Sequence, residues 1–187
     1  MAAIRPFHID IADETLERIR SRVCDYCWDD MADLDGWDHG SNLKYMKELC
    51  DYWVASFDWR RHEAELNRFP HFLASVDGND IHYIHVKGSG PNPMPLIISH
   101  GWPGSIVEFM DIIEPLAHPE RFGGDANDAF DVIAPSLPGF GFSAKPACPI
   151  GPRRIAELFH RLMTDVLGYD DYLAQGGDWG GAISSWL

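Results

Sequence analysis

The segment Gln175-Gly176-Gly177-Asp178-Trp179-Gly180-Gly181 decides the fold of this chain. Apolar residues at 172–174 lead into it as a strand would, and residues 181–187 leave it with the composition of the first turns of a helix. Gly176 and Gly180 lie two positions before and two positions after Asp178, which suits a tight turn with a strained residue at its apex. We therefore predict a strand-to-helix turn with Asp178 at that apex.

An aspartate at such an apex indicates a particular chemistry. The commoner pattern G-x-S-x-G carries a serine nucleophile there. A serine that attacked saturated carbon would form a stable ether, whereas a carboxylate forms an ester that water can hydrolyse. Asp178 needs no base to ionise it, because the reference pKa of aspartate is about 3.9. The pattern favours a nucleophile for epoxides or alkyl halides; by itself it fits a glycine-rich turn with a solvated or capping aspartate equally well.

The composition describes an acidic chain of ordinary domain length. It has 187 residues, 45% of them hydrophobic and 12% aromatic, which suffices for a sizeable core. The formal charge of -14 argues against nucleic acid or an anionic membrane surface as partner. No run approaches the roughly 20 apolar residues of a membrane span, and residues 1–8 contain no apolar signal region. We expect a cytoplasmic protein without a membrane anchor.

The cysteines give little support for a metal site. Cys24 and Cys27 form a C-x-x-C pair, but neither a second pair nor histidines at zinc spacing accompany it. We therefore predict no metal and expect that these two, Cys50 and Cys148 are buried free thiols.

The first 70 residues read mainly as helices. Apolar residues at three- and four-residue spacings predict a helix from about 12 to 26, and glycines predict a loop over 29–41. Asn42 caps a second helix, whose apolar stripe from Leu43 to Phe57 we interpret as core. A shorter helix is expected over 59–69, before Pro70.

From residue 71 strands alternate with helices. Residues 72–76 and 81–86 read as two strands joined by a turn with an Asp-Gly signal, and His82 and His85 fall on opposite faces, so that one is expected to be exposed. Further strands are expected at 95–99, 130–135 and 172–176 and helices at 106–116 and 154–167. This order predicts an α/β domain with a parallel sheet, whose functional residues lie where strands end.

Three motifs at strand ends resemble the α/β-hydrolase superfamily, specifically its epoxide hydrolases. They are H-G-W-P at 100–103, L-P-G-F-G-F-S at 137–143 and G-G-D-W-G at 176–180. The N-terminal part is similar to that of the microsomal-type epoxide hydrolases, in the segments F-H-I-D-I, G-W-D-H-G, Y-M-K-E-L-C-D-Y-W, F-D-W-R and L-N-R-F-P-H-F. The resemblance covers nearly the whole chain. It implies a helical N-terminal segment (1–70) and the first part of an α/β-hydrolase domain (71–187).

The resemblance also implies roles for individual residues. Asp178 matches the nucleophile, and the backbone N–H groups of Trp102 and Trp179 match the oxyanion hole, with their rings as candidate pocket walls. The side chain of His100 is expected to be structural. The remaining motif residues are Gly101, Pro103, Gly176, Gly177 and Gly180. The implied reaction converts a small apolar epoxide and water into a vicinal diol without a cofactor; the resemblance predicts no oligomeric state.

The chain departs from the family after the apex. The family activates water with a late histidine and an acid and protonates the ring with two cap tyrosines, but the nine residues that follow Asp178 contain no His, Tyr, Asp or Glu. The strand at 172–176 would also remain an edge strand. We therefore expect the α/β-hydrolase fold to be truncated after the elbow and the 187-residue chain to be an inactive fragment.

Two alternatives remain at this point. A haloalkane dehalogenase also has Asp-Trp after a small pair, and Asp178-Trp179 does not separate the two activities. The N-terminal segment and the H-G-W-P-G-S run favour the epoxide enzyme. A non-catalytic α/β-hydrolase-like protein is the second alternative.

Overall fold

The computed structural model describes residues 4–29, 31 and 36–187. The loop expected over 29–41 lies partly outside these ranges, and residues 1–3 lie wholly outside them. The chain forms two compact units, one comprising Ile9–Glu65 and the other comprising the residues up to His8 together with Leu66–Leu187. The predicted division at residue 70 stays a prediction.

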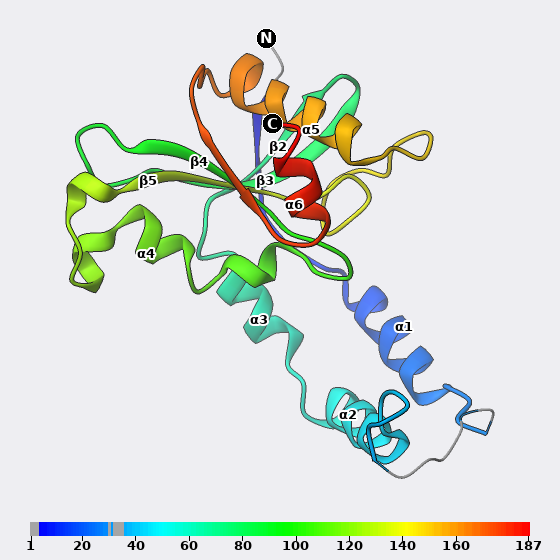
Figure 1. Ribbon diagram of the computed structural model, residues 1–187. Coiled ribbons are helices and arrows are strands. Elements are labelled where there is room, and N and C mark those ends of the chain that lie inside the picture. Colours follow the sequence, from blue (N-terminus) through cyan, green and yellow to red (C-terminus); the bar gives the residue numbers. More distant parts are fainter. Residues whose placement is uncertain (1–3, 30, 32–35) are drawn as a thin grey trace. The chain divides into compact units, whose positions relative to one another are not determined.

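The first unit contains the helices α1 (Asp13–Cys24), α2 (Leu43–Ala55) and most of α3 (Trp59–Leu66) (Figure 1). The side chain of Asn42 caps α2, as predicted, by accepting a hydrogen bond from the N–H of Tyr45 at 3.0 Å. Buried Glu63 joins α3 to the segment before α1. Its carboxylate accepts hydrogen bonds from the N–H of Ile11 at 2.7 Å and from Arg60 at 2.6 Å.

The apolar stripe of α2 is not a core, so this prediction was wrong. Only Leu43 of the helix is buried, while Leu49 and Trp53 are 41% and 44% exposed. The stripe lines an open hollow of about 840 Å³ together with residues of α1 and α3. The reason is that the three short helices, among the described residues of this unit, provide no second layer to cover it.

The second unit is built on a six-stranded sheet in the order β1-β2-β3-β5-β4-β6. The strands are β1 (Ile4–Phe7), β2 (His71–Val76), β3 (Asn79–Val86), β4 (Met94–Ser99), β5 (Phe130–Pro135) and β6 (Leu173–Gly176). Pairing is antiparallel from β1 to β5, while β4 lies parallel to both β5 and β6. Strand β1 was not expected. The predicted edge position of β6 is confirmed, because β4 is its only partner among the strands of the described residues.

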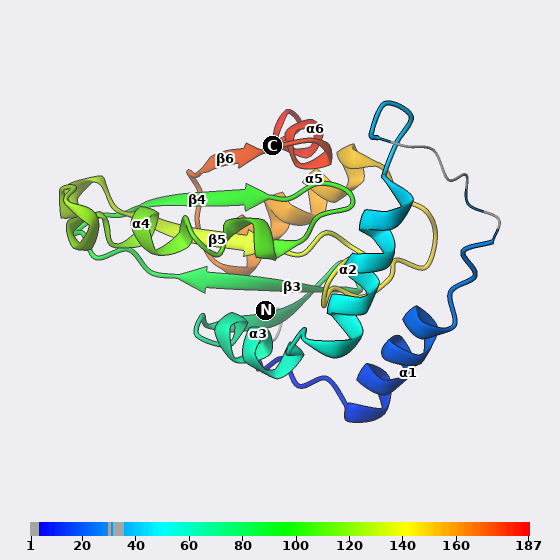
Figure 2. The same ribbon diagram turned by 90° about the horizontal axis from the view of Figure 1, so that it is seen from below.

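Helices cover both faces of the sheet. Figure 1 shows α4 (Ile113–Ala117) on one face and α5 (Pro152–Arg161) with α6 (Trp179–Ser184) on the other, and Figure 2 shows α4 in front of the strands and α5 behind them. A π-helical turn, Leu162–Val166, continues α5. The single helix expected over 106–116 is instead a 3-10 turn, Ile106–Phe109, followed by α4. Two more 3-10 turns, Pro119–Phe122 and Ala126–Asp128, precede β5.

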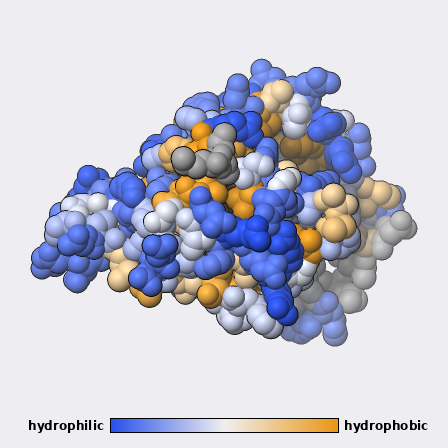
Figure 3. All heavy atoms as spheres, turned by 90° about the horizontal axis from the view of Figure 1, so that it is seen from above, coloured by the Kyte–Doolittle hydropathy of each residue, from blue (hydrophilic) through white to orange (hydrophobic). Residues whose placement is uncertain are grey.

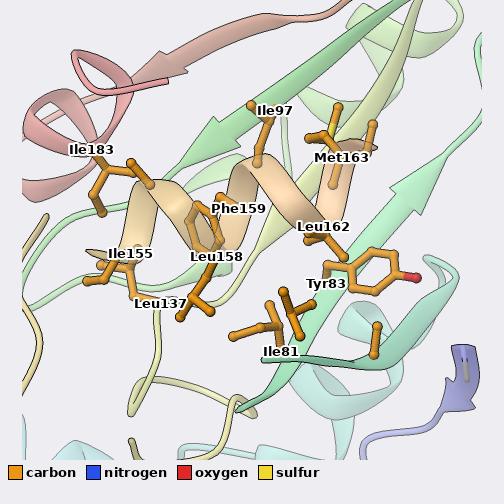
Figure 4. Close-up of a cluster of buried hydrophobic side chains, with 14 residues drawn as sticks. Ile81, Tyr83, Ile97, Leu137, Ile155, Leu158, Phe159, Leu162, Met163 and Ile183 are labelled. Carbon is orange, nitrogen blue, oxygen red and sulfur yellow. The ribbon is translucent and has the colours of Figure 1, made fainter. Parts of the chain in front are cut away.

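The main core lies between the sheet and α5 (Figure 4). Ile97 and Ile133 from the strands meet Leu158 and Phe159 from α5, and all four are fully buried. Ile183 of α6 belongs to the same cluster, so the helix after the elbow is fixed by core packing. Burying a side chain of this size contributes about 1.5–3 kcal/mol.

Two predictions about polar side chains were wrong. His82 is fully buried and His85 is half-buried, because β3 lies between β2 and β5 with both of its faces covered. The cysteines were expected to be buried, but Cys24, Cys27 and Cys148 are exposed and Cys50 is only half-buried.

The face in Figure 3 is mostly hydrophilic, with hydrophobic residues in separate patches. Within the described residues, no helix combines the length and the apolar character that a membrane crossing requires.

Candidate active site

The turn between β6 and α6 holds Asp178 in a strained conformation. Its φ of 53° and ψ of -123° lie where residues other than glycine are rare. Gly176 and Gly180 make the turn possible. A Cβ on Gly176 would lie 2.4 Å from the carbonyl group of Gly180, and a Cβ on Gly180 would lie 1.9 Å from the carbonyl oxygen of Ser99. The apex is therefore a nucleophile elbow in geometry as well as in sequence.

The sheet register brings the H-G-W-P loop to the elbow. Ser99, the last residue of β4, pairs with Gly176, the last residue of β6, so both loops leave the same edge side by side. The N–H of Trp102 donates a hydrogen bond to Oδ1 of Asp178 at 2.9 Å. Gly101 permits this approach, because a Cβ there would lie 2.5 Å from the same oxygen. The peptide bond from Trp102 to Pro103 is cis.

Two backbone donors stabilise the ionised form of the carboxylate. The N–H groups of Trp102 and Trp179 hydrogen-bond to Asp178 and hold its pKa below the usual value of 3.8. Asp178 is exposed, and so are the rings of Trp102 and Trp179, at 66% and 45%. The group is thus an ionised, accessible carboxylate with two amide donors directed at it.

His100 is buried, and both of its ring nitrogens form hydrogen bonds. Its Nε2 accepts the N–H of Leu137 at 3.1 Å, so its Nδ1 carries the proton and donates to the carbonyl of Gly101 at 2.9 Å. Burial lowers the pKa of His100, which keeps the ring neutral. The ring therefore joins the H-G-W-P loop to the residues that follow β5.

A capping box fixes the other end of that loop. The hydroxyl of Ser105 accepts the N–H of Val107 at 3.3 Å, and Glu108 accepts the N–H of Ser105 at 3.2 Å. Sequence reasoning missed this pair, although S-x-x-E before an apolar run is its usual signal.

A second histidine, His82, is hydrogen-bonded to Ser136, the first residue after β5. The hydroxyl of Ser136 donates to Nδ1 of His82 at 2.9 Å, Nε2 of His82 donates to Nδ1 of His71 at 2.9 Å, and Nε2 of His71 donates to the carbonyl of Leu66 at 2.8 Å. These directions follow because the Leu66 carbonyl only accepts. Both rings are buried, and burial, with His71 beside it, lowers the pKa of His82 to about 3. No local sequence signal marks this row, because its members come from three separate segments.

An apolar hollow adjoins the nucleophile. It has a volume of about 440 Å³ and lies between the two tryptophans and the segment after β5. Only carbon-rich side chains and the two indoles line it, among the described residues: Trp102, Leu137, Pro138, Phe140, Pro146, Pro149, Ile150, Ile155 and Trp179. Most of these residues were not singled out from the sequence.

The structure brings most of the predicted site residues together at the apex, while His100, Pro103 and Gly177 lie outside this group. Asp178, Trp102, Trp179 and Gly101 meet at the apex, with Gly176 and Gly180 packed against it. His100 lies buried below them, and Pro103 follows in the loop. A Cβ on Gly177 would touch nothing within 4 Å. Among the residues that the structure describes, no group of three or more His, Cys, Asp or Glu side chains could hold a metal ion.

The fold and the elbow define the α/β-hydrolase class, and residues 94–187 match the family described as alpha/beta hydrolase fold. Residues 4–109 match the family described as Epoxide hydrolase N terminus. The chain belongs to the epoxide hydrolase family.

Named relatives agree with this assignment. A putative epoxide hydrolase of Stigmatella aurantiaca is 42% identical over 185 residues, which cover 98% of this chain and 42% of that protein. Juvenile hormone epoxide hydrolase 2 of Ctenocephalides felis is 41% identical over 187 residues, covering 98% and 39%. The crystal structure of juvenile hormone epoxide hydrolase from the silkworm Bombyx mori superposes with a TM-score of 0.85 at 30% identity, covering 100% of this chain and 44% of that one.

The chain therefore spans about two fifths of the length of the curated relatives it matches, 42% and 39% in the two cases above. These relatives give no support to the haloalkane dehalogenase alternative.

Proposed function

We propose that Asp178 is the nucleophile of an epoxide hydrolase and that Trp102 and Trp179 supply its oxyanion hole. The observation that carries this proposal is the 2.9 Å hydrogen bond from the N–H of Trp102 to an exposed carboxylate at the apex of a nucleophile elbow. Membership of the epoxide hydrolase family supports it.

In the first step a carboxylate oxygen of Asp178 attacks one carbon of the epoxide. A C–O bond forms, the ring C–O bond breaks, and the ring oxygen leaves as an alkoxide that takes a proton from an acid or from water. The product is a glycol ester on Asp178. The low pKa of Asp178 serves this step, because the carboxylate is ionised without a base.

In the second step water attacks the ester carbonyl carbon and releases the vicinal diol. Negative charge then develops on the carbonyl oxygen, where the N–H groups of Trp102 and Trp179 stabilise it. Loss of one such donor typically lowers the rate about 100- to 1000-fold. Among the described residues, the hydrogen-bond partners of the Asp178 carboxylate are the backbone N–H groups of Trp102 and Trp179, and neither can act as a base toward the water. We therefore expect the ester on Asp178 to form in this chain and to hydrolyse slowly.

Mass spectrometry tests the proposal directly. The chain is incubated with a terminal epoxide, and the expected product carries one added epoxide mass on the peptide that contains Asp178, removable by mild base as an ester. Asp178→Asn should abolish this adduct, whereas Asp171→Asn, which changes an exposed carboxylate nearby, should not. An adduct that persists at equal rate in Asp178→Asn overturns the proposal, provided that the mass excludes deamidation.

A further inference from the structure

The peptide group between Gly101 and Trp102 is held at both of its ends. Its N–H is that of Trp102, which donates to Oδ1 of Asp178 at 2.9 Å. Its carbonyl oxygen is that of Gly101, which accepts a hydrogen bond from Nδ1 of His100 at 2.9 Å. Because a trans peptide group is planar and its N–H and C=O point in opposite directions, a hydrogen bond to the oxygen orients the N–H. His100 therefore orients a donor that it does not itself supply.

A second peptide group, between Ser136 and Leu137, is held in the same way. Its N–H, that of Leu137, donates to Nε2 of His100 at 3.1 Å. Its carbonyl oxygen, that of Ser136, accepts a hydrogen bond from the hydroxyl of Ser143 at 2.7 Å. The hydroxyl oxygen of Ser143 in turn accepts the backbone N–H of His82 at 2.9 Å. The ring of His100 thus joins two peptide groups, each of which is fixed at both ends.

These groups form a donor series, which runs from the backbone N–H of His82 through Ser143 and His100 to Asp178. In each of its five hydrogen bonds the donor lies toward His82 and the acceptor toward Asp178. The directions follow because backbone N–H groups only donate and carbonyl oxygens only accept. Successive hydrogen bonds polarise one another, and each is strengthened by about 10–30%. The last donor of the series, the N–H of Trp102, faces the carboxylate.

The donor series lies in the interior until it reaches the apex. Ser136, Leu137, Ser143 and His100 are all buried, so water does not compete for their hydrogen bonds. The ring of Phe140 packs edge-on against the ring of His100, at 5.8 Å between centroids. Burial keeps the pKa of His100 low, and the neutral ring retains the one protonated and one unprotonated nitrogen that the series requires.

We propose that His100 and Ser143 are positioning residues, which aim the N–H of Trp102 at Asp178 and strengthen its hydrogen bond through the donor series. The inference rests on the proposed function for its effect on rate, while the series itself belongs to the resting protein. In the ester, the N–H of Trp102 faces the oxygen on which charge develops when water attacks. A weaker or tilted donor should therefore slow the hydrolysis of the ester more than its formation.

Two neighbouring buried serines provide a matched pair of variants. Ser143→Ala removes a hydroxyl that belongs to the donor series and leaves the carbonyl of Ser136 without this donor. Ser136→Ala removes a hydroxyl that lies outside the series, because it donates to the side chain of His82 at 2.9 Å. Both changes remove a buried hydrogen bond, so both should lower the melting temperature. Only Ser143→Ala should change the hydrogen bond at Asp178.

Nuclear magnetic resonance of the full chain, labelled with nitrogen-15 tryptophan, measures that hydrogen bond without any substrate. The amide resonance of Trp102 is identified by its loss in Trp102→Phe. In Ser143→Ala the amide proton should move to higher field, and the midpoint of its titration with Asp178 should move to higher pH, because a weaker hydrogen bond stabilises the carboxylate less. In Ser136→Ala both values should remain those of the parent chain.

Kinetics of the ester measure the effect on the reaction. The ester is formed on Asp178 with 1,2-epoxybutane, and its formation and hydrolysis are followed by intact mass. Ser143→Ala should slow hydrolysis about tenfold, which is less than the 100- to 1000-fold loss typical of removing a whole donor. Formation of the ester should change less than about twofold, because charge does not develop on the carbonyl oxygen in that step. Ser136→Ala should leave both rates near those of the parent chain.

The outcomes separate the inference from the proposed function. A Trp102 amide that is unchanged in Ser143→Ala, or displaced equally in both serine variants, overturns the inference and leaves the proposed function standing. A proton on Nε2 of His100, read from nitrogen-15 histidine shifts, also overturns it and requires no variant to fold. The absence of any Asp178 adduct overturns the proposed function and the rate effect derived from it. An amide displaced only in Ser143→Ala, together with slower ester hydrolysis, supports both.

Discussion

The backbone N–H of Trp102 donates a hydrogen bond to Oδ1 of Asp178 at 2.9 Å, although the two residues lie 76 positions apart in the chain. The contact exists because β4 and β6 are parallel neighbours that end in register, at Ser99 and Gly176. Two loops that start from the same edge of the sheet thus place the backbone donor of Trp102 beside the carboxylate acceptor of Asp178.

Gly101→Ala should test how closely this arrangement is fitted. The added Cβ would lie 2.5 Å from Oδ1 and 2.6 Å from Cβ of Asp178, so the carboxylate must move away from the Trp102 amide. A displacement of about 1 Å typically costs about 100-fold in rate. We expect that loss in the rate of epoxide adduct formation, followed by intact mass. Gly151→Ala is the control, because a Cβ there meets nothing within 4 Å. Equal rates in both variants would contradict the prediction.

The pH dependence of adduct formation should reflect the low pKa of Asp178. The ionised form is the nucleophile, and a pKa held below 3.8 by two amide donors keeps that form present to lower pH. We expect a rate constant that is level from pH 7 to about 4 and declines only below the usual aspartate value. A peptide spanning residues 172–184, which has no Trp102 amide, should decline at higher pH. Identical midpoints for the peptide and the chain would show that the donors do not act.

The buried histidines should make the fold sensitive to acid. His82 and His85 have pKa values lowered to about 3 and about 4, mainly by burial. The unfolded chain takes up protons at these rings near pH 6.5, but the folded chain does not. Stability is therefore complete above that pH and falls as the pH decreases from 6.5 toward 3.

Between pH 6.5 and 5, His82 alone should lower the free energy of unfolding by about 2 kcal/mol. Urea unfolding at the two pH values measures this difference. It should be smaller in His82→Gln and unchanged in His160→Gln, which alters an exposed ring. A difference of the same size in His82→Gln as in the parent chain would contradict the assignment.

The free edge of β6 should promote self-association. Leu173 is 49% exposed on a strand that has β4 as its single partner in the part of the chain that the structure describes. Exposed apolar edges offer unpaired backbone groups to other chains, and lysine is a common protection. Leu173→Lys should reduce concentration-dependent association in sedimentation velocity, and Ile112→Lys, which adds the same charge away from the sheet edge, should reduce it much less. Equal effects of the two variants would assign the change to net charge.

The elements with strong local signals could be predicted from the sequence. The N-cap at Asn42, the strands β2 to β6 and the turn around Asp178 each depend on glycines, caps or apolar runs within a few residues. The contact between Trp102 and Asp178 was expected only through the resemblance, since its geometry depends on strand order. Strand β1 has four residues and pairs with β2, which lies more than sixty positions later in the chain, so no local pattern marked it.

The predictions failed where the burial of a side chain depends on a partner from a distant part of the chain. The stripe of α2 has the spacing of a core helix, but spacing does not reveal whether a second layer exists. His82 looked like one of two alternating side chains, yet it is buried because Ser136 and His71 supply the partners that make burial tolerable. Most residues that line the hollow beside Asp178 were missed for another reason. They lie between Leu137 and Ile150, in a loop without hydrophobic periodicity.

The backbone angles of Asp178 create a trade-off between thermal stability and catalytic activity. Glycine adopts φ 53°, ψ -123° without a Cβ penalty, so Asp178→Gly should relieve strain of about 1–3 kcal/mol while removing the proposed nucleophile. A laboratory evolution campaign that rewarded heat resistance alone would therefore drift toward glycine at this position. A screen for thermostable variants must therefore also select for activity, because the most stable variants would lack the proposed nucleophile.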